Sequence, residues 1–189
     1  MAKAIHRHII LIGMPGCGKS TLGAELGRRL GRPYIDTDQQ IEQAAGARLQ
    51  DLLDSRGPEA FAALEEQVGL RVDPDSPGII ATGGSMVYSD AAMEHLARVG
   101  LIVFIDVPLE RLMQRVGSGH DRGLLNRTDG GLAEMYAERL PLYQRHADIT
   151  VRLDGGTPAD HVEQLLARLD HAPASPSIAR GTSAAGSCR

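Results

Sequence analysis

One short stretch restricts the possible folds of this chain more than any other, and it reads Gly13-Met14-Pro15-Gly16-Cys17-Gly18-Lys19-Ser20-Thr21. It has the spacing G-x-x-x-x-G-K-[ST] of a phosphate-binding loop. The apolar run 8–12 before it predicts a buried parallel strand, and the leucines within 20–30 predict an amphipathic helix that ends near Gly31. Strand, loop and helix thus follow in the order that points backbone N–H groups at a phosphate. A glycine-rich turn without a ligand is the alternative.

Lysine is rare in this chain, which has only Lys3 and Lys19 against eighteen arginines. The compact ammonium of Lys19 can reach the β- and γ-phosphates of a nucleotide, where a planar guanidinium is too bulky. The Ser20 hydroxyl is then placed to bind Mg²⁺. Cys17 is expected to be a small loop residue rather than a catalytic thiol, because no partner base stands near it in the sequence. The predicted nucleotide-binding residues of the loop are Gly13, Pro15, Gly16, Cys17, Gly18, Lys19, Ser20 and Thr21.

The composition excludes several classes of protein. A length of 189 residues suggests one domain, and its core must be aliphatic, since the chain has only four Tyr, two Phe and no Trp. The net charge of −4 argues against a nucleic-acid-binding surface, and no apolar run approaches the length of a membrane span. With two cysteines and no secretory signal, we expect a cytoplasmic protein, and we take it to be a monomer that acts on a small molecule.

Strand and helix patterns alternate along the chain, which predicts a three-layer α/β/α fold around a five-stranded parallel sheet. Further strands are expected at 33–35, 79–81, 101–105 and 148–153. Helices are expected from residue 39 onward, at 49–53, and at 59–71, 91–99, 109–116, 132–146 and 158–169, with a turn at 56–58. The segment 117–128 is rich in Gly, Ser, Asp and Arg, which suits a mobile lid. We therefore expect a single domain over 1–171 and a disordered tail over 172–189.

Two acids and two glycines follow strands directly, and they are Asp36, Asp38, Gly83 and Gly84. Ligands of parallel sheets bind at the carboxyl ends of the strands, so these residues and the phosphate loop should meet in one crevice. One carboxylate can then face a metal ion while the other reaches the hydroxyl of an acceptor. The alternative is structural, because an aspartate in the position of Asp38 suits a helix N-cap.

Taken in order, these motifs resemble those of the shikimate kinases, which have a nucleoside-monophosphate-kinase-like P-loop fold. The resemblance covers residues 8–170. Asp36-Thr37-Asp38 matches the family motif D-[ST]-D, Arg122-Gly123-Leu124-Leu125 matches the lid motif R-P-L-L, and Arg139-Leu140-Pro141-Leu142-Tyr143 matches R-x-P-L-Y. The resemblance implies an enzyme that uses ATP and Mg²⁺ to convert shikimate to shikimate 3-phosphate in aromatic amino-acid biosynthesis.

The resemblance also implies a role for individual residues. Ser20 and Asp36 would hold Mg²⁺, and Asp38 would contact the acceptor hydroxyl as a base. Arg115 and Pro158 would lie on the two faces of the adenine ring. The catalytic residues would be Lys19, Asp38 and Arg122, with Arg122 also binding ATP from the lid. The substrate-binding residues would be Asp38, Phe61, Gly83, Gly84, Ser85 and Arg139, with Arg139 gripping the substrate carboxylate.

Departures from the family pattern fall mainly on the acceptor side. The motif F-R-x-x-E appears as Phe61-Ala62-Ala63-Leu64-Glu65, and the motif G-G-G appears as Gly83-Gly84-Ser85. Ala62 thus stands where the family has a second carboxylate-binding arginine, for which Arg56 is a candidate replacement. The alternative acceptor is a hydroxy amino acid such as homoserine. Two other rivals are a nucleotide-binding protein that has lost catalysis and a nucleoside monophosphate kinase.

Overall fold

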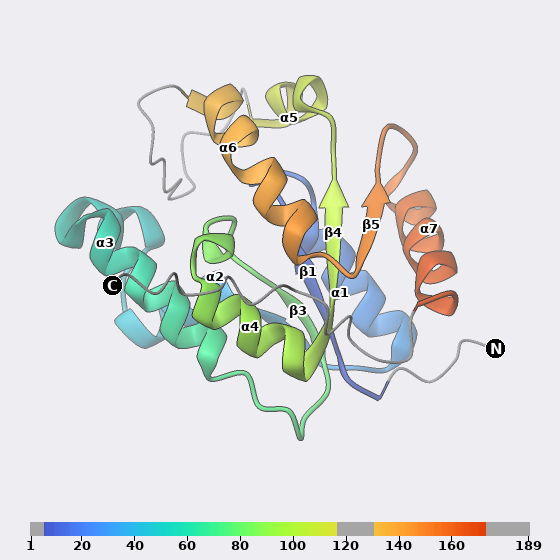
Figure 1. The fold of residues 1–189 in the computed structure, drawn as a ribbon, viewed down its shortest axis with the longest axis horizontal. Helices are drawn as coiled ribbons and strands as arrows, with labels where there is room; N and C mark the ends of the chain where they lie inside the picture. Colours follow the sequence, from blue (N-terminus) through green and yellow to red (C-terminus); the bar gives the residue numbers. More distant parts are fainter. Residues whose placement is uncertain (1–5, 117–130, 173–189) are drawn as a thin grey trace, which may run out of the picture.

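The computed structural model describes residues 6–116 and 131–172, and these form a five-stranded sheet between layers of helices (Figure 1). The strands are β1 (His8–Ile12), β2 (Tyr34–Asp36), β3 (Ile79–Ala81), β4 (Gly100–Asp106) and β5 (Ile149–Arg152). Their order in the sheet is β2-β3-β1-β4-β5, and every neighbouring pair is parallel. The predicted five-stranded parallel sheet is confirmed, with each strand within two residues of its expected ends.

The helices cover both faces of the sheet. They are α1 (Lys19–Leu30), α2 (Thr37–Ala45), α3 (Leu49–Leu70), the short 3₁₀ helix η1 (Met86–Tyr88), α4 (Asp90–Val99), α5 (Leu109–Val116), α6 (Gly131–His146) and α7 (Pro158–Asp170). In Figure 1, α4 and α6 pass in front of the sheet, while α1 lies behind it and packs against α7. In the part of the chain that is described, no helix is long and apolar enough to cross a lipid bilayer.

Helix α3 consists of two helical segments that meet at Gly57, which agrees with the expected helices on either side of a turn at 56–58. The chain changes direction at Gly57, whose φ of 79° lies in the left-handed region that favours glycine. Pro58 then starts the second segment, because proline is tolerated in a first helical turn. Beyond the kink, residues at four-residue spacing face inward, and these are Phe61, Glu65 and Gly69.

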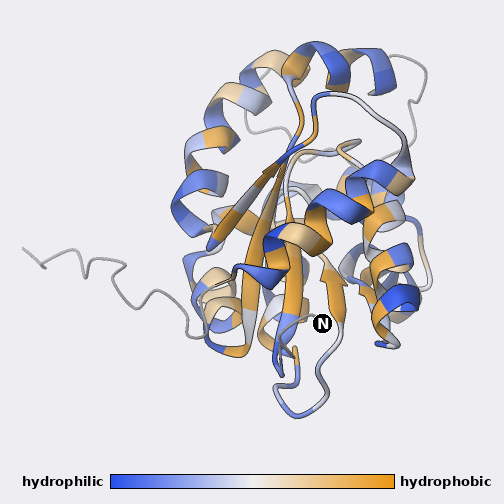
Figure 2. Cartoon of the chain, turned by 90° about the vertical axis from the view of Figure 1, so that its right-hand side faces the viewer, coloured by the Kyte–Doolittle hydropathy of each residue, from blue (hydrophilic) through white to orange (hydrophobic). Residues whose placement is uncertain are grey.

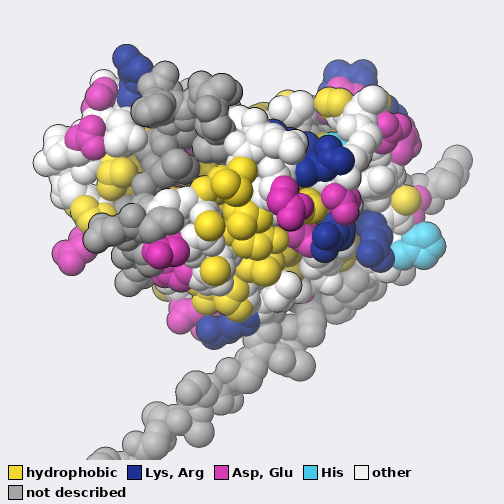
Figure 3. Space-filling model, turned by 90° about the horizontal axis from the view of Figure 1, so that it is seen from above, with side chains coloured by type: hydrophobic (Ala, Val, Ile, Leu, Met, Phe, Trp, Pro, Cys, Tyr) yellow, Lys and Arg dark blue, Asp and Glu magenta, His cyan; other side chains and the backbone are white. Residues whose placement is uncertain are grey.

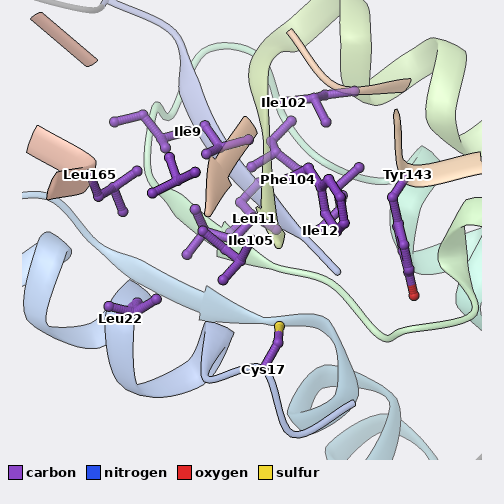
Figure 4. Close-up of a cluster of buried hydrophobic side chains, with 14 of the residues drawn as sticks. Ile9, Leu11, Ile12, Cys17, Leu22, Ile102, Phe104, Ile105, Tyr143 and Leu165 are labelled. Carbon is purple, nitrogen blue, oxygen red and sulfur yellow. The ribbon is translucent and has the colours of Figure 1, made fainter. Parts of the chain in front are cut away.

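The core is aliphatic, as the composition predicts. Strands β1 and β4 contribute side chains with almost no exposed surface, and Figure 2 shows these apolar strands between helices with polar outer faces. Phe104 of β4 and Tyr143 of α6 supply an aromatic contact, with ring centroids 5.2 Å apart and planes at 18° (Figure 4). Because both faces of the sheet are buried in this way, its carboxyl edge is held rigidly beneath the loops that follow each strand.

Candidate active site

A cavity of about 1000 Å³ lies over the carboxyl ends of the strands. Figure 3 views this end of the molecule from above, where apolar side chains gather at the middle with acidic and basic side chains beside them. Twelve predicted site residues line the cavity: Pro15, Gly16, Cys17, Gly18, Lys19, Ser20, Thr21, Asp36, Asp38, Gly84, Arg115 and Pro158. Segments far apart in the sequence therefore meet at one edge of the sheet, as the strand order requires.

The glycine loop leads directly into α1. Gly18, the N-cap residue, has a φ of 99° and no side chain that could cap the first turn. The first N–H groups of a helix have no partner within the helix, and the helix dipole adds positive potential there. The N-terminus of α1 is consequently suited to an anionic phosphate.

Lys19 lies against the loop that precedes it. Its Nζ donates hydrogen bonds to the carbonyl oxygens of Gly13 (2.8 Å) and Met14 (3.0 Å), and its side chain is buried. The ammonium thus sits among the backbone groups that would surround a phosphate. Cys17 turns its Sγ toward the apolar core, as Figure 4 shows, and its carbonyl oxygen accepts a hydrogen bond from Arg115 Nη1 (3.4 Å).

Ser20 and Asp36 form the oxygen-rich side of the cavity. Ser20 Oγ donates to Asp36 Oδ2 (3.1 Å), which also accepts a hydrogen bond from the Tyr34 hydroxyl (2.9 Å). Burial, followed by the Asp36 carboxylate, raises the pKa of Tyr34, so this hydroxyl keeps its proton and donates. Magnesium prefers oxygen ligands and usually keeps several waters and substrate phosphates, so a hydroxyl and a carboxylate beside the phosphate loop fit this ion.

The N-cap of α2 is Asp36 rather than Asp38, which corrects the structural alternative considered for Asp38. Asp36 Oδ1 accepts from the backbone N–H groups of Asp38 (3.0 Å) and Gln39 (3.4 Å). An aspartate side chain caps best when its own backbone is extended, and the φ and ψ of Asp36 are −111° and 117°. Asp38 lies in the first turn of α2 and lines the cavity.

Gly83 lies beneath two carboxyl groups. A Cβ on Gly83 would collide with Glu65 Oε1 and would lie 2.7 Å from Asp38 Oδ1, so both oxygens face the same small space. The Gly83 N–H donates to Thr37 Oγ1 (2.9 Å), which fixes the strand end against α2. Only a residue without a side chain leaves room for the two acids to approach each other here.

Glu65, the glutamate of the stretch that matches F-R-x-x-E, is a buried carboxyl that was not among the predicted site residues. Ser85 Oγ donates to Glu65 Oε2 at 2.5 Å. Burial, as the largest effect, raises the pKa of Glu65 to about 7; the Ser85 hydrogen bond lowers it, the charge of Asp38 raises it, and Arg139 and Lys19 lower it. Its interaction with Asp38 follows from the packing of α3 against the end of β3, which no local pattern reveals.

Arg139 is buried on α6 directly behind Gly84. Its Nε donates to the Tyr88 hydroxyl (3.2 Å), and its guanidinium lies over the Tyr88 ring at 5.1 Å from the centroid. A Cβ on Gly84 would lie 3.0 Å from Arg139 Nη1, and the Tyr143 hydroxyl donates to the Gly84 carbonyl oxygen (2.6 Å). The guanidinium is therefore held in one orientation close to the acceptor glycines.

The remaining predicted residues lie elsewhere. Phe61 packs in a small cluster with Ile41 and Leu52, and it is not among the residues that line the large cavity. Arg122 and the predicted lid lie outside the described residues, as does the predicted tail apart from its first residue. Arg56, the candidate replacement cation, is exposed on α3 and is absent from the lining.

Several lining residues had no assigned role in the sequence: Leu22, Gln39, Glu42, Arg48, Leu49, Gln50, Asp51, Thr82, Gly156 and His161. Thr82 could have been identified, because it follows β3 directly, just as Asp36 ends β2. Arg48 precedes α3 and carries no comparable local signal. The Nε2 atom of His161 lies 2.7 Å from the Gly155 carbonyl oxygen.

Comparison with known proteins decides between the kinase families that share this geometry. A family model described as shikimate kinase matches residues 15–170. The chain belongs to the shikimate kinase family. It is 34% identical over 162 residues to the shikimate kinase of Rhodococcus jostii, covering 85% of this chain and 96% of the relative. It is 39% identical over 161 residues to that of Microcystis aeruginosa, covering 84% of each chain.

Solved structures agree with this family membership. The structure described as shikimate kinase from Acinetobacter baumannii in complex with shikimate has a TM-score of 0.78 and 28% identity, covering 86% of this chain and 92% of the other. The shikimate kinase of Aquifex aeolicus has a TM-score of 0.73 and 30% identity, covering 86% and 96%. The predicted family and P-loop fold are confirmed, and the chain is an ATP- and Mg²⁺-dependent kinase that phosphorylates a hydroxyl group.

Proposed function

We propose that this chain transfers the γ-phosphoryl group of ATP to the 3-hydroxyl group of shikimate. The observation that supports this most is the meeting of the phosphate loop, the Ser20–Asp36 pair and Asp38 around one cavity, with Arg139 behind its acceptor end. The relatives named as shikimate kinases support shikimate as the acceptor, and they do not support homoserine.

In the proposed reaction, the acceptor hydroxyl oxygen bonds to the γ-phosphorus while the bond from that phosphorus to the β,γ-bridging oxygen breaks. The bond's electron pair leaves with ADP, and the hydroxyl proton passes to the Asp38 carboxylate. Lys19 and the N–H groups at the start of α1 hold the phosphates in line for this displacement. Ser20 and Asp36 would hold Mg²⁺, which would supply positive charge to the phosphate oxygens.

Other roles in this proposal rest on position or on the family resemblance. Arg115 and Pro158 line the cavity and would contact adenine. Arg139 would bind the acceptor carboxylate, because its buried guanidinium lies beside Gly84 and is oriented by the Tyr88 hydroxyl. Arg122 and a closing lid complete the proposal from the sequence. A cytoplasmic location and a monomeric state remain predictions.

A coupled assay of ADP release with a panel of acceptors tests the proposal. The purified protein is supplied with Mg²⁺-ATP and with shikimate, homoserine, CMP, UMP or AMP, and the phosphorylated product is identified by ³¹P NMR. We expect turnover with shikimate well above that with the other compounds. Faster turnover of a nucleotide or of homoserine would replace the proposed acceptor, and ATP binding without turnover of any compound would favour a protein that has lost catalysis.

A further inference from the structure

Tyr34 lies behind the proposed metal site, and its hydroxyl contacts one of the two residues assigned to the ion. It is the first residue of β2 and stands two positions before Asp36, so both side chains leave the strand on the same face. Tyr34 is half-buried and is not among the residues that line the cavity of about 1000 Å³, whereas Ser20 and Asp36 are. It can therefore act on a bound ion only through these two residues.

Helix α1 fixes the position of the Tyr34 ring. A Cβ on Gly23 would lie 2.5 Å from Cε2 and 3.0 Å from Cδ2 of this ring, so the ring rests directly on the helix backbone. Gly23 follows Ser20 by three residues, which places both on one face of α1. The hydroxyl at the far end of the ring is thereby held beside Ser20 and Asp36.

The Asp36 carboxylate accepts hydrogen bonds on both of its oxygens. Oδ1 accepts from the N–H groups of Asp38 (3.0 Å) and Gln39 (3.4 Å). Oδ2 accepts from the hydroxyls of Ser20 (3.1 Å) and Tyr34 (2.9 Å). A carboxylate has about four lone-pair positions, so each of these positions is matched by a donor. Tyr34 supplies the donor that comes neither from the helix cap nor from the phosphate loop.

A carboxylate engaged in this way favours an ion that keeps its own water. Mg²⁺ gives up bound water reluctantly and is usually held by only one or two carboxylates together with substrate phosphates. Ca²⁺ takes about six to eight oxygen ligands and bonds directly to carboxylates. Asp36, while it is held by its donors, thus supplies negative charge to Mg²⁺ but withholds a ligand that Ca²⁺ needs.

We propose that Tyr34 is a positioning residue that determines which divalent cation this site prefers. Its hydroxyl keeps Oδ2 of Asp36 occupied, so the carboxylate acts on the ion through water and the Ser20 hydroxyl rather than by a direct bond. The site consequently discriminates in favour of Mg²⁺ and against Ca²⁺. The inference rests on the proposed roles of Ser20 and Asp36, and it does not depend on which acceptor the protein phosphorylates.

The experiment compares the wild type with Tyr34→Phe, which deletes only the hydroxyl. Mn²⁺ is bound to each protein together with ADP, and its release by added Mg²⁺ or Ca²⁺ is followed by electron paramagnetic resonance. In Tyr34→Phe, Oδ2 is open to a direct bond, so the concentration of Ca²⁺ needed relative to that of Mg²⁺ should fall by about tenfold. Tyr136→Phe removes a hydroxyl from another half-buried tyrosine, which does not line the cavity, and should keep the wild-type ratio.

A spectroscopic signature separates this role from a loss of packing. Aspartate is labelled with ¹³C at its side-chain carboxyl, and electron–nuclear double resonance of the bound Mn²⁺ measures the coupling to the carbon of a directly bonded carboxylate. We expect no such coupling in the wild type and a clear coupling in Tyr34→Phe. Gly23→Ala, whose Cβ would displace the ring while the Tyr34 hydroxyl stays in the chain, should shift the ratio of Ca²⁺ to Mg²⁺ in the same direction.

The outcomes distinguish this inference from the proposed metal site. An unchanged ratio of Ca²⁺ to Mg²⁺ in Tyr34→Phe, or a directly bonded carboxylate already in the wild type, overturns the role of Tyr34 alone. Mn²⁺ binding that survives Asp36→Ala without loss of affinity overturns the proposed metal site, and the role of Tyr34 with it. Because Tyr34→Phe retains the ring that packs on α1, its thermal midpoint should stay close to that of the wild type, and the test does not depend on whether Gly23→Ala folds.

Discussion

The hydroxyl of Ser20, at the start of α1, donates to the carboxylate of Asp36, at the end of β2, across 3.1 Å. The same carboxylate caps α2 through its other oxygen. One side chain thus joins the phosphate loop to the helix that carries Asp38. The metal site and the acceptor base are consequently held by the same short segment of chain, and substitutions of Asp36 can separate their two roles.

Asp36→Asn should weaken the binding of Mg²⁺ while it keeps the N-cap of α2. Asparagine caps helices about as well as aspartate, but it lacks the negative charge that attracts the ion. We expect a thermal midpoint close to that of the wild type and a Mg²⁺ concentration for half-maximal activity that is raised at least about tenfold. Asp36→Ala is the matched variant, since it should also lose about 1 kcal/mol of stability with the cap. An unchanged Mg²⁺ requirement in Asp36→Asn would remove Asp36 from the metal site.

Lys19→Ala should lower kcat by a factor of about 10²–10⁴, because the point charge that neutralises the transferred phosphoryl group is lost. Lys19→Arg should restore little of this activity, since the planar guanidinium does not fit beside the Gly13 and Met14 carbonyl groups. Steady-state kinetics of both variants with saturating ATP checks this expectation. Near-normal turnover of Lys19→Arg would show that charge alone suffices at this position.

Gly83→Ala should abolish acceptor turnover, because the added Cβ would collide with Glu65 and crowd Asp38. ATP binding should persist, since Gly83 is not among the residues that line the nucleotide cavity. Gly31→Ala is a useful control: nothing lies within 4 Å of its added Cβ, but its φ of 63° should cost about 1 kcal/mol of stability. We predict that Gly83→Ala loses activity but retains its ATP affinity, whereas Gly31→Ala loses stability but retains activity.

Glu65 should also make the stability of the fold depend on pH. The folded state raises the pKa of this acid from 4.5 to about 7, so the folded protein binds more protons than the unfolded chain between those values. The free energy of unfolding therefore falls as the pH rises from about 4.5 to 7 through this group. Thermal melts of the wild type and Glu65→Gln across this range measure the effect, which should be absent from the variant. Parallel curves for both proteins would contradict it.

Local patterns account for the nucleotide half of the site. The loop spacing, the apolar run before it and the leucines after it place β1 and α1 without tertiary information. The end of β2 could also be predicted from the sequence. The N-cap of α2 proved to be Asp36 rather than Asp38, because the backbone of Asp36 is extended and Asp38 is already helical. The break in α3 at Gly57 was also predicted, since a glycine followed by a proline usually ends a helix.

Tertiary packing accounts for the acceptor half. Glu65, Gly83 and Arg139 come from three elements that are distant in the sequence, and their approach depends on how α3 and α6 pack around the end of β3. The substitution at Ala62 suggested an altered acceptor, but the sequence could not show that Ser85 would become the partner of Glu65. Secondary-structure propensity and motif spacing describe residues that are close in the sequence. The contact between Ser85 and Glu65 instead depends on the packing of segments that are distant in the sequence.

The most direct measurement of the central claim is the turnover of shikimate by the wild type and by Asp38→Asn under saturating Mg²⁺-ATP. Asparagine keeps the shape of the side chain but cannot take the hydroxyl proton. We predict shikimate 3-phosphate from the wild type and a fall in kcat of about 10²–10⁴ in the variant, with the KM for ATP unchanged. Equal kcat values for the two proteins, or no phosphorylated shikimate from the wild type, would contradict the account.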